Sequence, residues 1–192
     1  MNRMPVVDTS SSARDRILHG AMELFAERGF GSTSVKSIAE RAGVSQGLMY
    51  RYFDSKDALL RAIFEEGLRG VWSTFGSAED GDPFQAIEML MHRSFAAVAE
   101  RSSLWRLIYA LRHQRGVLER VSPEIAAAGA EIELALERLC RRAGLPEPAI
   151  EAKALFALID GANQHRVLDP DGYPVERVIE ATVAKLRLAA AR

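Results

Sequence analysis

The sequence contains few of the features that mark secreted or membrane proteins. Its single cysteine, Cys140, excludes an internal disulfide framework and suits a reducing compartment. No apolar run approaches the length of a membrane span, and residues 1–16 lack the apolar core of a signal peptide. We therefore expect a cytoplasmic protein without a membrane partner.

A strong excess of charge of either sign is also absent. The 192 residues carry 25 Lys and Arg against 26 Asp and Glu, a formal net charge of −1. Residues 1–56 hold eight basic and six acidic side chains, which leaves 17 and 20 for residues 57–192. This mild asymmetry permits a nucleic-acid partner for the first segment, but alone it is weak support for one.

Strand patterns are almost absent, and apolar residues recur instead at the 3.6-residue period of a helix. Most of these stripes begin behind a capping residue such as Ser12, Ser34 or Ser45, and several end at a glycine. The predicted helices cover residues 13–28, 35–42, 46–53, 56–72, 84–98, 104–111, 124–143, 150–159 and 175–189. The sequence therefore predicts an all-α fold, with a turn-rich break at residues 76–83.

Residues 33–56 have the spacing of a helix-turn-helix. The two helices need a small residue where they cross, which Ala39 supplies, and a turn residue that tolerates a left-handed backbone, which Gly43 supplies. Met49 and Phe53 have the spacing to hold the second helix against its neighbours. The N-terminal end of such a second helix is the part that enters the major groove of DNA.

The outer face of this second helix carries side chains suited to DNA. Gln46 can pair with adenine, and Arg51 can reach guanine or a phosphate. Taken singly, such residues also fit ordinary solvated or half-buried positions, and only their occurrence together in one frame favours DNA. The predicted DNA contacts are Thr33, Ser34, Lys36, Ser45, Gln46, Gly47, Leu48, Tyr50, Arg51, Tyr52 and Lys56.

Two stretches carry a resemblance to a known family. Residues 33–60, TSVKSIAERAGVSQGLMYRYFDSKDALL, closely resemble the DNA-binding region of TetR-type repressors, and residues 17–30, ILHGAMELFAERGF, look like that family's first helix. The resemblance covers about the first third of the chain. It implies that phosphates are held by Tyr50, Tyr52 and Lys56, while bases are faced by Ser45, Gln46, Gly47 and Arg51.

The chain departs from the family pattern at two positions. Leu48 stands where many members carry Thr or another small residue, so it either contacts a thymine methyl or packs inside the protein. Val35 replaces a frequent hydroxyl residue, which moves the expected phosphate contact to Thr33 or Ser34, with Lys36 nearby.

A single helix-turn-helix reads too few base pairs to find a site in a genome, and a dimer with two recognition helices about 34–36 Å apart solves this problem. Residues 154–159, ALFALI, are apolar on every side of their helix, which indicates burial on more than one face. The resemblance implies dimers that pair the last two long helices; a central helix of a monomer is the alternative. The predicted interface is Leu155, Phe156, Leu158, Ile159, Ala162, Val178, Ile179, Val183 and Leu186.

The resemblance also implies a ligand cavity in the second part of the chain. Large aromatic residues with a few polar groups suit a drug-sized pocket, although they suit an ordinary core as well. The predicted lining residues are Phe95, Trp105, Tyr109, His113, Asn163 and His165. The histidines lack metal-ligand spacing, so we expect neither a metal nor a cofactor.

These observations predict a helix-turn-helix DNA-binding domain at residues 1–56 and a ligand-binding and dimerisation domain at residues 57–192, with the helix from Asp57 to Trp72 as the lever between them. The predicted function is that of a homodimeric repressor, released from a palindromic operator by a small-molecule effector. One alternative is the same DNA-binding role with a protein partner or no effector. An enzyme in the helical body is the other, although no nucleophile–base pair supports it.

Overall fold

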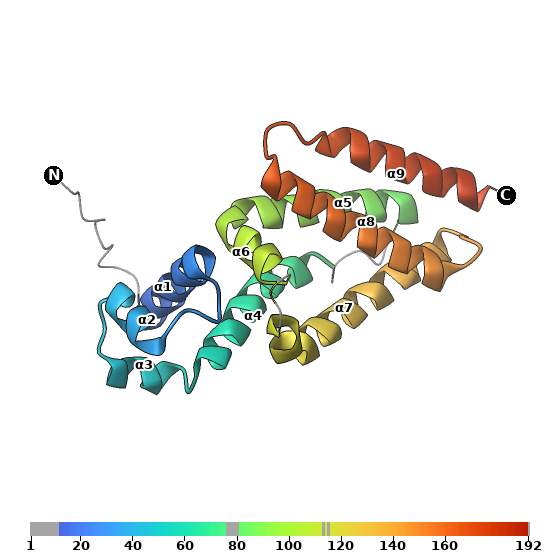
Figure 1. Cartoon of the computed structure of the whole chain (residues 1–192). Coiled ribbons are helices and arrows are strands. Elements are labelled where there is room, and N and C mark those ends of the chain that lie inside the picture. The colour runs from blue at the N-terminus through green and yellow to red at the C-terminus, as the bar shows by residue number, and fades with distance from the viewer. Residues whose placement is uncertain (1–11, 76–80, 113, 115, 192) are drawn as a thin grey trace.

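The regular structure in the described part of the protein is entirely helical, which confirms the predicted all-α class. The computed structural model describes residues 12–75, 81–112, 114 and 116–191, and this part forms nine helices with no strand (Figure 1). Their bounds are α1 Ala13–Arg28, α2 Val35–Ala42, α3 Gln46–Tyr52, α4 Lys56–Phe75, α5 Pro83–Glu100, α6 Ser102–Arg112, α7 Val117–Arg142, α8 Pro148–Leu168 and α9 Val175–Ala190.

Helices α1–α3 form a compact head at one end of the molecule, and α4 leads from it into a body made of α5–α9 (Figure 1). The centre of the head contains large apolar side chains from all three helices. Ile17 and Phe25 of α1, Ile38 of α2 and Met49 of α3 are each at most 1% exposed. Burial of these apolar side chains supplies most of the free energy that holds three short helices together.

The ends of the head helices follow the capping residues that the sequence predicts. The Ser12 and Ser34 side chains each accept a hydrogen bond from the backbone three residues later, in a reciprocal capping box. Gly43 ends α2 with φ of 65°, in the left-handed region that favours glycine. These local signals fix where α1 and α2 begin and where α2 turns towards α3.

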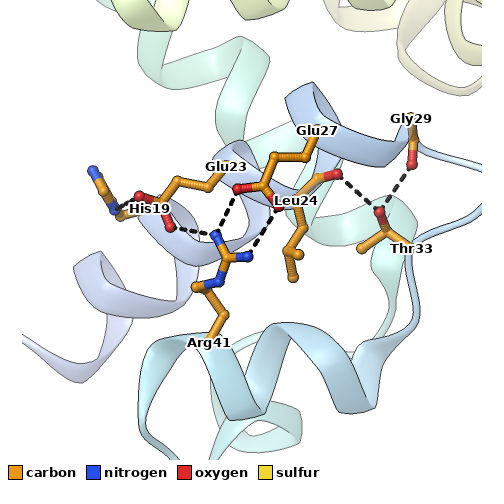
Figure 2. A network of polar contacts seen from close by, with 7 residues as sticks. All are labelled: His19, Glu23, Leu24, Glu27, Gly29, Thr33 and Arg41. Atoms are coloured by element: carbon orange, nitrogen blue, oxygen red, sulfur yellow. Dashed lines mark hydrogen bonds and ion pairs between the residues drawn. The ribbon is translucent and has the colours of Figure 1, made fainter. Parts of the chain in front are cut away.

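Ionic hydrogen bonds join α1 to α2 on the surface of the head (Figure 2). Arg41 of α2 lies 2.9 Å from a Glu23 carboxylate oxygen and 3.0 Å from each Glu27 oxygen, both on α1. The hydrogen bond from Arg41 lowers the pKa of the Glu27 carboxyl below its ordinary value. This fork-shaped contact fixes the crossing of the two helices in addition to the apolar core.

The body differs from the prediction at the start of α7. We expected this helix to begin only after Pro123, but it begins at Val117 and includes Pro123. A proline has no backbone N–H, so Pro123 removes one hydrogen bond from the helix. The loss is small for a helix of 26 residues. The longer α7 contacts α4, α5, α6 and α8, and none of the described helices is long and apolar enough to cross a membrane.

Candidate DNA-binding surface and body cavity

Helix α3 presents most of the predicted DNA contacts on one outer face. Ser45 caps the helix, because its Oγ accepts a hydrogen bond from the Leu48 N–H at 3.1 Å. Met49 points into the core and is 0% exposed, whereas Tyr50 is 50% exposed. Gln46 and the other outward positions follow at helical spacing. The residues of α3 exposed to solvent are Gln46, Gly47, Tyr50, Arg51 and Tyr52.

Gly47 is not required by the packing of the protein. A Cβ atom built at this position would meet only the Ser45 hydroxyl, at 4.0 Å, and Gly47 does not have a positive φ. Glycine inside a helix is less favourable than alanine. Packing within the chain therefore does not explain the glycine at this position. Leu48 beside it is partly buried, so part of its side chain packs within the head.

Two further predicted contacts lie at the start of α2. Ser34 is exposed and its hydroxyl accepts from the Ser37 N–H at 3.0 Å, so it is occupied by the cap of α2. Lys36 is also exposed, and its nearest acidic partner is Glu40, at 3.9 Å. Both side chains remain accessible to a partner next to α3.

Thr33 does not lie where the prediction placed it. Its side chain is 2% exposed, and its hydroxyl lies 2.9 Å from the Gly29 carbonyl oxygen and 3.2 Å from that of Leu24 (Figure 2). The predicted phosphate contact of this side chain is therefore wrong. The hydroxyl instead satisfies carbonyl oxygens at the end of α1 and in the following loop.

Lys56 makes contacts within the head that the sequence did not predict. Its ammonium donates to the carbonyl oxygens of Phe30 at 2.7 Å, Thr33 at 2.9 Å and Gly31 at 3.4 Å, and it lies 4.4 Å from the centre of the Phe30 ring. Burial lowers the pKa of this ammonium below its ordinary value. The N–H groups of this ammonium are directed at the loop between α1 and α2, so the side chain braces this loop, while its predicted phosphate contact stays a prediction.

Phe30 lies where the head meets the body. Its side chain is 6% exposed, and its N–H donates to Oε1 of Gln114, in the turn between α6 and α7, at 3.0 Å. The Arg120 guanidinium of α7 lies 5.5 Å from the centre of the Phe30 ring and binds Asp57 of α4 at 2.7 Å. No sequence signal links positions 84 residues apart, so sequence reasoning did not find this junction.

The body contains a cavity of about 370 Å³, bounded by side chains of α4–α8. Of the six predicted lining residues, Trp105, Tyr109 and Asn163 do line it. Phe95 is 1% exposed and does not line this cavity, so its side chain belongs to the core; His165 is exposed and stacks on Tyr173 with ring centres 6.1 Å apart. These two predictions are wrong for this cavity, and His113 lies outside the described residues.

The polar groups around the cavity are mostly paired with each other. Arg112 binds the two Asp160 carboxylate oxygens at 3.0 and 3.1 Å, and Lys153 binds Glu133. Burial raises the pKa of the Tyr109 hydroxyl, which therefore stays protonated at neutral pH. In the part of the chain that the structure describes, no group of three or more His, Cys, Asp or Glu side chains could hold a metal ion.

Most of the predicted dimer residues are buried inside the single chain. An interface between two copies needs atoms that one copy exposes, so the residues that the core covers cannot form it directly. These are Leu155, Ile159, Ala162, Ile179, Val183 and Leu186, each at most 8% exposed. Phe156 lines the cavity, whereas Leu158 is 38% exposed and Val178 is partly exposed. The prediction took the apolar surface all round α8 as a sign of a second copy. In the structure α8 instead packs on several helices of its own chain.

A head with a capped recognition helix on a helical body defines a helix-turn-helix DNA-binding regulator. The sequence profile described as "Bacterial regulatory proteins, tetR family" matches residues 17–63, and that described as "Tetracyclin repressor-like, C-terminal domain" matches residues 83–188, which is more than half of the chain. The chain belongs to the TetR family of transcriptional regulators.

Individual relatives agree with this assignment. The chain is 36% identical over 87 residues to the transcriptional regulator UidR of Escherichia coli K12, a stretch that covers 43% of this chain and 44% of UidR, so it spans less than half of that relative. It is 25% identical over 201 residues to TtgR of Pseudomonas putida, covering 96% of each chain. The solved complex of SmeT with triclosan superposes with a TM-score of 0.71 over 91% of each chain at 24% identity, which shows a shared fold.

Replacing Lys56 by methionine tests the bracing role of its ammonium. Lys56→Met keeps the apolar stem but removes three hydrogen bonds to the loop, so we expect the free energy of unfolding to fall by about 1–2 kcal/mol. Urea unfolding followed by circular dichroism measures the change. Lys36→Met, which removes an exposed ammonium of the same head, is the matched control and is expected to change stability by less than about 0.5 kcal/mol. Equal effects of the two variants would contradict the bracing role.

Proposed function

We propose that this protein is a homodimeric repressor that binds a palindromic operator through residues 1–56 and is released by a small molecule that binds in residues 57–192. The observation that carries the DNA part is the outer face of α3, where polar and aromatic side chains gather around a glycine that the packing does not need. The family description names a repressor, and occupation of a promoter-proximal operator represses by blocking access.

Gly47→Ala separates DNA contact from folding. Alanine is the better helix former, and the position has room for a Cβ atom, so we expect the free energy of unfolding to stay the same or to rise by up to about 1 kcal/mol. If the backbone at Gly47 lies against DNA, the added methyl group will lower operator affinity by about tenfold or more. Fluorescence anisotropy with a labelled operator duplex measures this affinity.

Gly129→Ala is the matched control for this substitution. It also places alanine inside a helix, on α7 of the body, where the added Cβ atom would meet only the Phe156 ring at 3.7 Å. It should leave operator affinity unchanged. Unaltered affinity in Gly47→Ala would exclude close approach of this face to DNA.

The dimer part is supported by the outer faces of α8 and α9. Both helices lie on the side of the body away from the head (Figure 1). Leu188 is 67% exposed and Leu158 is 38% exposed. Several small exposed or partly exposed residues accompany these leucines and would let two helices approach closely. They are Ala154, Ala157 and Gly161 on α8, and Ala181 and Ala184 on α9. We propose this face, in place of the buried residues predicted from sequence, as the dimer interface.

Gly161→Arg tests this interface. The position is open to solvent within one chain, so the substitution should fold normally but place a charged side chain between two copies. We expect the mass in solution, measured by light scattering after gel filtration, to fall from twice the chain mass to the chain mass. Ala99→Arg, which adds the same charge at an exposed position of α5, should remain a dimer. A Gly161→Arg protein that stays fully dimeric would exclude this face.

The effector part is supported by the cavity and by its connection to the head. A volume of about 370 Å³ lies in the range of small-molecule sites, and the structurally similar SmeT was solved with triclosan. Arg112 lines the cavity at the end of α6, and Gln114, two residues later, accepts the Phe30 N–H of the head. A ligand that moves the end of α6 would therefore move the head, in addition to any movement of α4. The ligand must bind the two conformations with different affinities to release DNA.

Gln114→Ala tests this connection. The substitution removes the acceptor of the Phe30 N–H, and we expect the operator affinity without ligand to change little. In the wild-type protein a cavity ligand such as 4-phenylphenol should lower operator affinity about tenfold. In Gln114→Ala the same ligand should lower it less than about threefold. Gln114→Glu keeps an acceptor oxygen and should retain the full reduction. Anisotropy titrations of operator with and without the phenol measure both. A full response in Gln114→Ala would show that the signal travels elsewhere.

An enzyme in the body is the second candidate, and the described residues favour it less. Burial raises the pKa of the Cys140 thiol to about 11, so this thiol is protonated and a poor nucleophile at neutral pH. The named relatives are transcriptional regulators. Incubation of the purified protein with cavity ligands, followed by mass spectrometry, distinguishes a binder from an enzyme because only an enzyme forms product.

A further inference from the structure

The cavity contains a buried polar group whose orientation is fixed. Asn163 of α8 lines the cavity and is 3% exposed. Its Nδ2 donates to the Ser94 hydroxyl oxygen at 3.0 Å and to the Ile159 carbonyl oxygen at 3.1 Å. A backbone carbonyl can only accept a hydrogen bond, so the amide nitrogen must lie on this side. The amide oxygen is therefore the polar atom that Asn163 can offer to another molecule.

This oxygen has no hydrogen-bond partner. Asn163 Oδ1 is the one buried side-chain nitrogen or oxygen among the described residues for which no donor lies within reach. A buried acceptor without a donor is unfavourable, and native proteins contain few of them. A leucine of similar size would fill the same space without this cost. The asparagine is explained if a donor comes from a molecule that enters the cavity.

The remaining lining restricts the chemistry of that molecule. The two cationic lining groups, Arg112 and Lys153, are paired with the two anionic ones, Asp160 and Glu133. A charged ligand would therefore lose its hydration without gaining a free counter-charge. Most other lining side chains are apolar, and they include Val98, Trp105, Ile108, Ile132 and Phe156.

We propose that the cavity takes an uncharged, largely aromatic molecule that carries one hydroxyl or N–H group, and that this group donates its hydrogen to Asn163 Oδ1. The inference rests on the proposed function, because it names the class of effector that the cavity takes. It adds a residue that sets specificity: Asn163 selects for a donor, whereas the apolar walls select for size.

A matched pair of ligands tests this specificity. The full chain is titrated with 4-phenylphenol and with 4-methoxybiphenyl, in which a methyl group replaces the donor hydrogen, and binding is followed by isothermal titration calorimetry. We expect the phenol to bind about tenfold more tightly than the ether, because only the phenol can donate to Asn163. In Asn163→Leu the ratio of the two affinities should fall to within about twofold of one.

Ile132→Val is the control, because it removes one methylene from the apolar wall without changing a polar atom. It should weaken both ligands alike and leave their ratio at about ten. Comparing this ratio between variants also cancels the difference in water solubility between the two compounds. Circular dichroism and operator binding of each variant confirm that it is folded.

The outcomes distinguish this inference from the proposed function. If the wild-type protein binds phenol and ether equally, or if Asn163→Leu keeps the preference, the donor role of Asn163 is overturned while the effector site stands. If Asn163→Leu does not fold, unsubstituted biphenyl, which lacks both the hydroxyl and the methyl group, serves as the reference for the wild-type protein, and equal affinities for the phenol and biphenyl overturn the donor role. If neither compound binds a protein that still binds its operator, the donor role and the effector part of the proposed function are both overturned, and the DNA part stands.

Discussion

The recognition helix cannot hold its own shape, and the head is organised around this constraint. Seven residues make fewer than two turns, far below the length at which an isolated helix is stable in water. The shape of α3 therefore comes from outside: Ser45 caps its start, and Met49 and Phe53 anchor it in the core. Because Ser45, Met49 and Phe53 fix the position of α3, its outer face has a defined geometry. A face of defined geometry can match the edge of a DNA groove.

The core of the head is supported by the body, and Phe30 connects the two parts. Its carbonyl accepts from Lys56 at the start of α4, its N–H donates to Gln114 before α7, and its ring lies against Arg120. One loop residue thus links the head to the two segments that lead to the cavity. Helix α1 also packs on α4 and α6, and the apolar side chains of head and body form one continuous core, so a change in their relative position must shift this packing together with the contacts of Phe30.

Local signals predicted much of this molecule, and long-range contacts could not be predicted. Capping residues and glycines placed α1, α2 and α3 within a residue or so, because caps act over three or four positions. The side chain of Thr33 was wrongly placed outside, since its buried acceptors at Leu24 and Gly29 depend on how the loop folds back. The contacts of Lys56 with Phe30 and Thr33 also depend on this loop, so they could not be predicted either. Leu155 and Ile179 looked available to a second copy because sequence shows that a helix is apolar but not which neighbour covers it.

The central claim is that two copies of this chain read a palindromic DNA site, and selection of binding sites from a pool of random duplexes tests it most directly. The claim predicts enrichment of one sequence with two inverted half-sites, whose centres are about one helical turn, or a multiple of it, apart, because two-fold symmetric heads contact successive turns of the groove. Enrichment of a single half-site would contradict the dimer, and no enrichment of any sequence would contradict the role of α3 in reading DNA.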